Sequence, residues 1–325
     1  MQRRWLRGVG VGGMSVGFFL ALLLGMRGGD VLLPRPSTRE DAEAVAGAAR
    51  GPSAVPLSLP GLLQHPEERL QAKAGMILSA PSGRILSEQN GFTQMPIASL
   101  TKLMSAMIVL DHGVDLGKEL TIAPGEFTIG GNLRIVPGSE TVTVRDLLYA
   151  SITGSANNAA LALARSTGLS RQDFLREMNR KAVALGLEQT SFADPTGLSP
   201  ANVGSAYDVA QLAAVAFRDY PLIRDAASRG EHTVVTRNTQ RVHVLKNPNG
   251  LFRRSPGRFI ASKTGYLDEA LYCLVLARET PHGTIIAVTL GHPSEEGSEE
   301  ETLNLLDEAE RRVAGLVTPE KDSVH

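Results

Sequence analysis

A serine and a lysine stand three residues apart in the apolar stretch IASLTKLMSAM, residues 97–107. Residues at this spacing share one face of a helix, so the amine of Lys102 can reach the hydroxyl of Ser99. Burial lowers the pKa of a lysine, and a neutral amine can take the proton of a serine that attacks a carbonyl. Ser99 also lies near the expected start of the helix, where the helix dipole favours developing negative charge. The pair could therefore supply a nucleophile and its base.

A purely structural interpretation explains the same pair, because Ser99 could cap the helix while Lys102 extends its amine to the surface. Ser-x-x-Lys also arises by chance about once in a chain of this length. Two further motifs favour the catalytic interpretation. Ser155-Ala156-Asn157 precedes an expected helix, and Lys263-Thr264-Gly265 stands at the end of an expected strand over 258–262. Singly, these could be a helix cap and an edge-strand charge. Together, and in this order, the three motifs resemble the motif set of a known class of serine enzymes.

The composition argues against several other functions. The 325 residues carry 33 basic and 34 acidic side chains, mixed along the chain, so nothing indicates the basic surface of a nucleic-acid-binding protein. The single cysteine, Cys273, excludes an internal disulfide and a cysteine-rich zinc site, and its apolar surroundings predict a core residue. The seven histidines are scattered without a metal-binding pair. We therefore expect neither a metal nor a cofactor.

The N-terminal segment, residues 1–30, is typical of a membrane-directed sequence. Arginines at positions 3, 4 and 7 precede an uncharged run over 8–26, which as a helix could roughly cross the ~30 Å hydrocarbon layer of a membrane. No good Ala-x-Ala pattern follows this run, so we favour an uncleaved anchor over a cleaved signal peptide that would leave the protein secreted. The arginines would keep this end in the cytoplasm and the bulk of the chain on the outer side of the cytoplasmic membrane, periplasmic or extracytoplasmic. Ser15 in this run matches Gly-x-Ser-x-Gly, but it lacks the strand and turn of an esterase elbow.

The rest of the chain divides into a Pro/Gly/Ala-rich flexible linker over 31–67, a folded region over 68–318 and a polar tail over 319–325. Strands are expected over 74–80, 84–89, 258–262, 270–277 and 284–290. Helices are expected over 99–111, after the capping pairs Thr143/Asp146, Ser170/Asp173 and Ser205/Asp208, and from Ser298 onward. Strands at both ends with helices between them predict an α+β domain on an antiparallel sheet. We expect the N-terminal hairpin and the late strands to join in that sheet.

The three motifs resemble those of the penicillin-binding proteins and serine β-lactamases. The stretches PIASLTKLMSAMIVLD, LGLEQTSFADPTGLS, SAYDVAQLA and KTGYLDEALYCLV are similar to the low-molecular-mass D-alanyl-D-alanine peptidases, over about residues 70–318. The resemblance implies a β-lactamase/transpeptidase-like fold, in which an antiparallel sheet flanked by helices meets an all-helical lobe at the active site. It implies a serine-type D-Ala-D-Ala carboxypeptidase that acts on peptidoglycan peptides ending in D-Ala-D-Ala, with β-lactam antibiotics as covalent inhibitors.

The family's catalytic roles carry over onto four residues of this sequence. By resemblance, Ser99 would be the acylated nucleophile and Lys102 its base. Ser155 would relay a proton to the leaving amine, and Asn157 would hold the amide group of the substrate.

The family's binding roles fall on the third motif. By resemblance, Lys263 and Thr264 would bind the carboxylate next to the scissile bond. Gly265 would let the substrate pair closely along the strand. The oxyanion hole would use the backbone N–H groups of Ser99 and Tyr266, which leaves the Tyr266 side chain without a role.

The resemblance leaves other activities open. Larger carboxypeptidases of the family carry a second β-rich domain and a C-terminal amphipathic anchor, whereas this sequence ends in the polar TPEKDSVH. It therefore also resembles the shorter members, including D,D-endopeptidases that cleave peptidoglycan cross-links. A serine β-lactamase is less expected, because Glu177 and Glu188 lie outside a loop motif that could activate a deacylating water, so the penicilloyl enzyme should be long-lived. A non-catalytic penicillin-binding protein is disfavoured by the three intact motifs.

Overall fold

The computed structural model describes residues 69–317, apart from 128–130, 132, 136 and 255–257. All described residues belong to one compact unit of the chain. The predicted anchor (1–30), linker (31–67) and tail (319–325) lie outside the described residues and stay predictions. Within the part that is described, no helix is both long enough and apolar enough to cross a bilayer.

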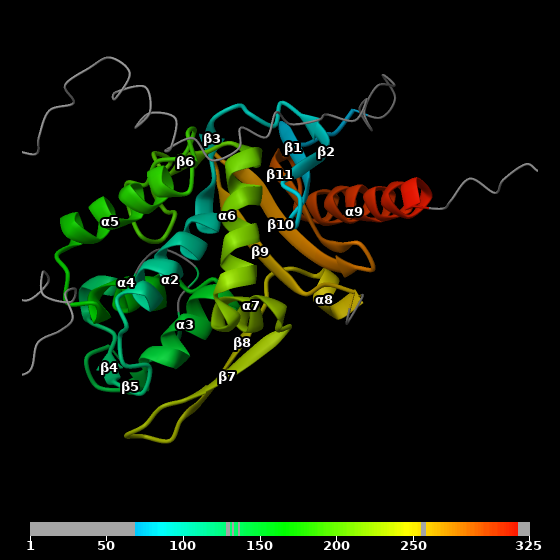
Figure 1. The fold of residues 1–325 in the computed structure, drawn as a ribbon. Coiled ribbons are helices and arrows are strands. Elements are labelled where there is room, and N and C mark those ends of the chain that lie inside the picture. The colour runs from blue at the N-terminus through cyan, green and yellow to red at the C-terminus, as the bar shows by residue number, and fades with distance from the viewer. Residues whose placement is uncertain (1–68, 128–130, 132, 136, 255–257, 318–325) are drawn as a thin grey trace, which may run out of the picture. The chain divides into compact units, whose positions relative to one another are not determined.

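A five-stranded sheet with the order β2-β1-β11-β10-β9 forms the centre of the fold (Figure 1). Its strands are β1 (Ala74–Ser79), β2 (Arg84–Gln89), β9 (Ala261–Leu267), β10 (Leu271–Thr280) and β11 (Gly283–His292). Every neighbouring pair is antiparallel. For β1–β2, β9–β10 and β10–β11, the short connection between the two strands requires this direction. The pairing of β1 with β11 confirms that the N-terminal hairpin and the late strands share one sheet. Strand β9 is left at the edge.

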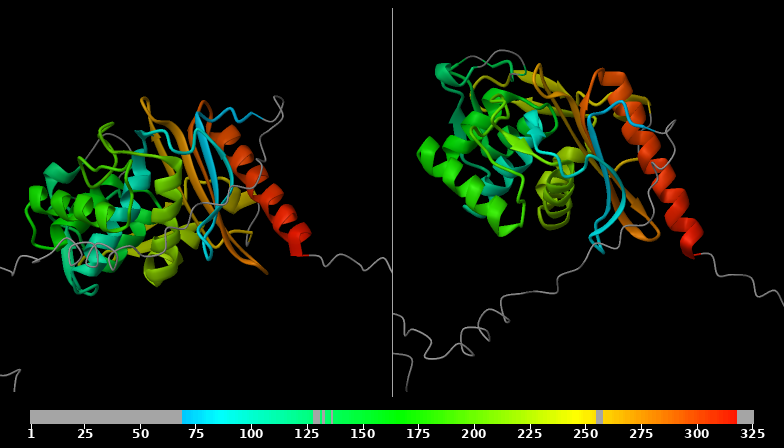
Figure 2. Two further views of the ribbon diagram at one scale, coloured as in Figure 1. Left: turned by 45° about the horizontal axis from the view of Figure 1, so that its top comes forward. Right: turned by 90° about the horizontal axis from the view of Figure 1, so that it is seen from above.

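The central strands alternate their side chains between two apolar layers. In β10, Cys273 and Val275 join the larger core beneath the central helices, whereas Leu274 and Leu276 join a smaller core beneath α9 (Glu295–Val317). This period of two follows from the pleat of a strand. Figure 2 shows α9 along one face of the sheet and the central helices on the other. The predicted fold class, an α+β domain on an antiparallel sheet flanked by helices, is confirmed.

Seven helices lie between β2 and β9 in the described residues: α2 (Thr101–Asp111), α3 (Val144–Ile152), α4 (Asn157–Ser166), α5 (Arg171–Ala184), α6 (Ala206–Asp219), α7 (Pro221–Ser228) and α8 (Leu251–Arg254). Helices α3, α5 and α6 begin at the predicted caps. In each case the hydroxyl of Thr143, Ser170 or Ser205 accepts the backbone N–H three positions later. These bonds satisfy donors that a helix start leaves unpaired.

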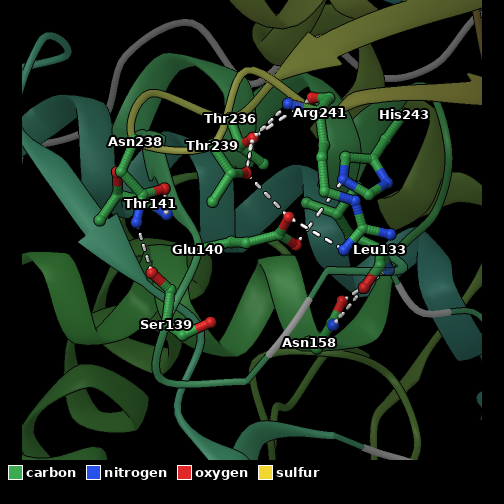
Figure 3. A network of polar contacts seen from close by, with 10 residues as sticks. All are labelled: Leu133, Ser139, Glu140, Thr141, Asn158, Thr236, Asn238, Thr239, Arg241 and His243. Atoms are coloured by element: carbon green, nitrogen blue, oxygen red, sulfur yellow. Dashed lines mark hydrogen bonds and ion pairs between the residues drawn. The ribbon is translucent and has the colours of Figure 1, made fainter.

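Six short strands form three antiparallel pairs around the helices. They are β3 (Met95–Pro96) with β6 (Val203–Gly204), β4 (Glu119–Thr121) with β5 (Thr141–Thr143), and β7 (Glu231–Val235) with β8 (Val242–Lys246). The β7–β8 hairpin is anchored through Glu140, which accepts hydrogen bonds from Thr239 (3.0 Å) and Arg241 (3.1 Å) in the turn (Figure 3). At its other end, Leu245 packs so closely on Gly154 that a Cβ there would approach within 3.1 Å. The hairpin thus supports the turn that carries the second motif.

Several predicted boundaries are wrong; β10, for example, ends at Thr280 and not at residue 277. The strand expected over 258–262 runs instead from Ala261 to Leu267, so the third motif lies inside β9 and not at the end of a strand. Helix α9 begins at Glu295 and not at Ser298. Its first turn is closed by the Ser294 hydroxyl, which accepts the N–H of Gly297 at 3.3 Å.

Candidate active site

The first motif lies where the 3₁₀ turn η2 (Ala98–Leu100) passes into α2. Lys102 Nζ donates a hydrogen bond of 2.6 Å to Ser99 Oγ, as the spacing on one helical face predicts. Helix α2 is buried along most of its length, and Lys102 is 0% exposed. The amine therefore does not extend to the surface, which excludes the purely structural interpretation of this lysine.

Two further acceptors surround the Lys102 amine. Nζ donates to Asn157 Oδ1 and to the backbone carbonyl of Thr196, each at 2.7 Å. Burial lowers the pKa of Lys102 from 10.5 to about 7, against the opposing effect of the Asp194 carboxylate. A substantial fraction of the lysine is consequently neutral near neutral pH, and a neutral amine can accept a proton.

The second motif occupies the turn between α3 and α4. Ser155 has a positive φ of 54°, in the left-handed region that non-glycine residues avoid, and Asn157 is the first residue of α4. Such a conformation costs about 1–3 kcal/mol and persists where the surroundings enforce it. The Ser155 hydroxyl accepts a hydrogen bond of 2.7 Å from Lys263 Nζ. The turn therefore presents this hydroxyl to the third motif.

A loop that precedes β5 packs against the second motif. The carbonyl of Gly131 accepts the backbone N–H of Asn157 at 2.5 Å. The side-chain amide of Asn158 bonds to the backbone of Leu133 in both directions (Figure 3). Its Oδ1 accepts the N–H of Leu133 at 2.8 Å, and its Nδ2 donates to the carbonyl of Leu133 at 2.9 Å. These contacts hold Gly131 and Leu133 against the start of α4, where Gly131 lines the site.

The third motif runs along the sheet edge beside the nucleophile. Lys263 is 2% exposed, and burial followed by the charge of Lys102 lowers its pKa well below the ordinary value. Besides Ser155, its amine contacts the carbonyl of Thr264 at 2.9 Å. A Cβ at Gly265 would lie 3.0 Å from the backbone nitrogen of Ser99, so only a glycine lets β9 pass this close without displacing the turn.

The three motifs meet at a cavity of about 670 Å³. The predicted site residues that line it are Ser99, Ser155, Asn157, Thr264, Gly265 and Tyr266. Lys102 and Lys263 reach it through their bonds to the two serines. The structure thus brings together every site residue named from the sequence. The Tyr266 side chain is half-exposed at the cavity, with its ring centroid 4.6 Å from that of Tyr272.

Other residues of the site were missed by sequence reasoning. The Thr196 carbonyl contacts Lys102, and the Gly131 carbonyl contacts Asn157, but backbone groups leave no side-chain signature in a sequence. Asp-Pro-Thr-Gly at 194–197 does indicate a turn. Nothing in it indicates which helix the turn covers. Cys273 is a core residue, as predicted, and burial raises the pKa of its thiol to about 11, which leaves it protonated.

Comparison with known proteins agrees with this geometry. A D-alanyl-D-alanine endopeptidase of Pseudomonas aeruginosa is 35% identical over 212 residues, which cover 65% of this chain and 68% of that protein. D-alanyl-D-alanine carboxypeptidase DacF of Bacillus subtilis is 29% identical over 242 residues, covering 73% of this chain and 61% of the relative.

A solved structure shares the fold. Penicillin-binding protein D2 of Listeria monocytogenes, in its cefotaxime-bound form, superposes with a TM-score of 0.66 at 29% identity, over 74% of this chain and 98% of that one. The sequence profile described as D-alanyl-D-alanine carboxypeptidase matches residues 63–294, which include all three motifs. The chain therefore belongs to the D-alanyl-D-alanine carboxypeptidase family of serine hydrolases.

Proposed function

We propose that this protein is a serine D-Ala-D-Ala carboxypeptidase that removes the terminal D-alanine of peptidoglycan stem peptides through an acyl-enzyme on Ser99. The observation that carries the proposal is the 2.6 Å contact between Ser99 Oγ and a fully buried lysine whose pKa is lowered to about 7. This contact couples a nucleophile to a base that is partly neutral at physiological pH.

The surroundings of Lys102 support its role as the base. Asn157 Oδ1 and the Thr196 carbonyl can only accept hydrogen bonds. In the neutral amine they hold the two N–H hydrogens, and the lone pair is left to face Ser99 Oγ. The proton of Ser99 then passes to Lys102 as Oγ bonds to the carbonyl carbon of the penultimate D-alanine.

Collapse of the tetrahedral intermediate breaks the C–N bond and releases D-alanine. The leaving nitrogen must gain the proton that Lys102 took from Ser99, and Ser155, which accepts a hydrogen bond from Lys263, would relay it. Backbone N–H groups of Ser99 and Tyr266 would stabilise the oxyanion, since β9 passes within contact distance of the Ser99 backbone. Water then attacks the ester on Ser99 and frees the shortened peptide.

Recognition of the substrate falls to the remaining motif residues. Lys263 and the Thr264 hydroxyl would bind the terminal carboxylate, whose negative charge would raise the lowered pKa of Lys263 again. Asn157 would hold the substrate's amide group. β-Lactams would acylate Ser99 in the same way, which the cefotaxime-bound structural neighbour supports. We expect that acyl-enzyme to be long-lived, because the glutamate that deacylates β-lactamases follows the second motif, and neither Glu177 nor Glu188 lines the cavity. The glutamates that do line it, Glu269, Glu295 and Glu299, all follow the third motif.

A second candidate is a D,D-endopeptidase that cleaves peptidoglycan cross-links. The relative from Pseudomonas aeruginosa, at 35% identity, carries that name. Both activities use an acyl-enzyme on the same serine and would share the three motifs. An outer location, with residues 1–30 as an anchor in the cytoplasmic membrane, would give either activity access to its substrate.

Purified muropeptides distinguish the two activities. Incubation with a monomeric pentapeptide should remove one terminal D-alanine, as mass spectrometry of the product would show. A protein that leaves the pentapeptide intact but converts cross-linked dimers to monomers is an endopeptidase. Failure to act on either substrate would contradict both proposals, provided that circular dichroism shows a folded protein.

A further inference from the structure

The segment from Asp194 to Ser199, between α5 and α6, is bonded to helix α2 at two places. The carbonyl of Thr196 accepts from Lys102 Nζ at 2.7 Å. The carbonyl of Pro195 accepts from the hydroxyl of Ser105, one helical turn further on, at 2.6 Å. We call residues 194–199 the Asp194 loop. Its backbone is thus part of the surroundings of the base.

The Asp194 carboxylate determines the shape of this loop. It is 5% exposed, and its Oδ1 accepts the backbone N–H groups of Thr196 (2.6 Å) and Gly197 (2.8 Å) as well as the Thr196 hydroxyl (2.5 Å). Its Oδ2 accepts the N–H of Ser199 at 2.6 Å. Burial alone would raise the pKa of Asp194, but these hydrogen bonds lower it below the ordinary value, so the group is ionised at neutral pH.

The same loop also contacts the nucleophile turn. A Cβ at Gly197, where φ is +87°, would lie 1.9 Å from the carbonyl oxygen of Ala98 and 2.8 Å from the backbone nitrogen of Ser99. Ala98 itself has a positive φ of 46°. Asn202 fixes the start of the Asp194 loop, because its Oδ1 accepts a hydrogen bond from the backbone N–H of Asp194 at 3.0 Å. The loop is therefore packed against both partners of the proton transfer.

We propose that Asp194 is a positioning residue, which acts through the Thr196 carbonyl to hold the Lys102 amine against Ser99 Oγ. Its negative charge acts on the same amine. The inference rests on the proposed roles of Ser99 and Lys102. Asp194 does not line the cavity, so it acts on the reaction only through these two residues.

Two titratable groups interact electrostatically with Lys102 from the elements packed around it. The Asp194 carboxylate lies in the loop and favours the ammonium of Lys102. Lys263 lies on β9, and burial followed by the charge of Lys102 lowers its own pKa well below the ordinary value. The direct partners, Ser99, Asn157 and the Thr196 carbonyl, are neutral. Loss of the Asp194 charge therefore leaves burial unopposed, and burial favours the neutral amine.

The test is the pH dependence of acylation in the full chain. The second-order rate of labelling by a fluorescent penicillin should fall below neutral pH in the wild type, with a midpoint near the Lys102 pKa of about 7. Asp194→Asn keeps an oxygen acceptor and removes the charge. We expect its midpoint to move to lower pH by about one unit, and its rate at high pH to fall about tenfold because the amine is less well placed.

Asp208→Asn is the matched control. Asp208 is also buried and accepts from Gln189 and Thr190, at 2.7 and 2.8 Å, but it contacts neither the Asp194 loop nor Lys102. We expect its midpoint to equal that of the wild type. If Asp194→Asn were labelled more slowly at every pH but kept the wild-type midpoint, the claim that the Asp194 charge acts on the Lys102 amine would be overturned.

A second variant covers the case in which Asp194→Asn does not fold. Thr196→Val keeps the carboxylate and the carbonyl and removes one hydrogen bond to Asp194. Its labelling rate at high pH should fall several-fold, and the midpoint of its pH dependence should not change. A labelling rate equal to that of the wild type would overturn the claim that the Asp194 loop positions the Lys102 amine. If the wild-type protein itself were not labelled at any pH, the proposed function would fail, which distinguishes that failure from one of the Asp194 inference.

Discussion

Lys102→Met should reduce the rate of Ser99 acylation by about 10²–10⁴-fold, the usual contribution of a general base. Methionine fills the space of the lysine but cannot take the proton from Ser99 Oγ, 2.6 Å away. The fold should survive, because the variant no longer buries an amine, although Asn157 Oδ1 and the Thr196 carbonyl each lose a donor. The measurement is the labelling rate with a fluorescent penicillin at pH 8.

Lys181→Met provides the control for this substitution. Lys181 lies in α5, where its amine contacts Asp111 and Tyr220, at 2.6 and 2.8 Å, outside the cavity. Its variant should be labelled at the wild-type rate. Labelling of Lys102→Met within about threefold of the wild type would mean that another group takes the proton.

Gly197→Ala should lower the acylation rate by about 10²-fold, the effect expected from displacing a reacting group by about 1 Å. The new Cβ would lie 1.9 Å from the Ala98 carbonyl oxygen, so the nucleophile turn must move. The positive φ of 87° adds a backbone penalty of about 1 kcal/mol. The measurements are the labelling rate and the free energy of unfolding in urea.

Gly186→Ala separates the two effects at Gly197. Gly186 has a similar φ of +70°, but a Cβ there would meet no atom within 4 Å. This variant should lose a comparable backbone contribution to stability and keep wild-type labelling. If Gly197→Ala behaved in the same way, close packing of the Asp194 loop on the nucleophile turn would not matter for the reaction.

The sequence was most informative where a local rule decides the structure. The hydroxyls of Thr143, Ser170 and Ser205 start helices as predicted, because a cap acts within four residues. Strands β10 and β11 are apolar on both faces, since helices cover both sides of the sheet, and such runs are easily recognised.

Boundaries were predicted less well where a local signal was ambiguous. Ser294 and Ser298 are both good caps, and Gly297 between them weakens the helical signal of the first turn of α9. The β7–β8 hairpin was missed because its strands mix histidine, threonine and lysine with valine. Its attachment depends on Glu140, about 100 residues away, which no local pattern reveals.

The same distinction applies to the site. Ser99 and Lys102 are three residues apart, so helical geometry alone predicts their contact. The approach of Ser155 to Lys263 spans 108 residues and came from the motif resemblance, not from spacing. The Asp194 loop contributes through backbone carbonyls and a close glycine contact, which become visible only once the chain has folded.

The most direct test of Ser99 as the nucleophile is mass spectrometry of the protein after incubation with benzylpenicillin. The intact wild-type chain should gain the mass of one penicilloyl group, and peptide mapping should place that group on Ser99. The Ser99→Ala variant should gain nothing while keeping its circular dichroism spectrum. An adduct of equal amount on Ser99→Ala, or one mapped to Ser155 or Cys273 in the wild type, would contradict the assignment.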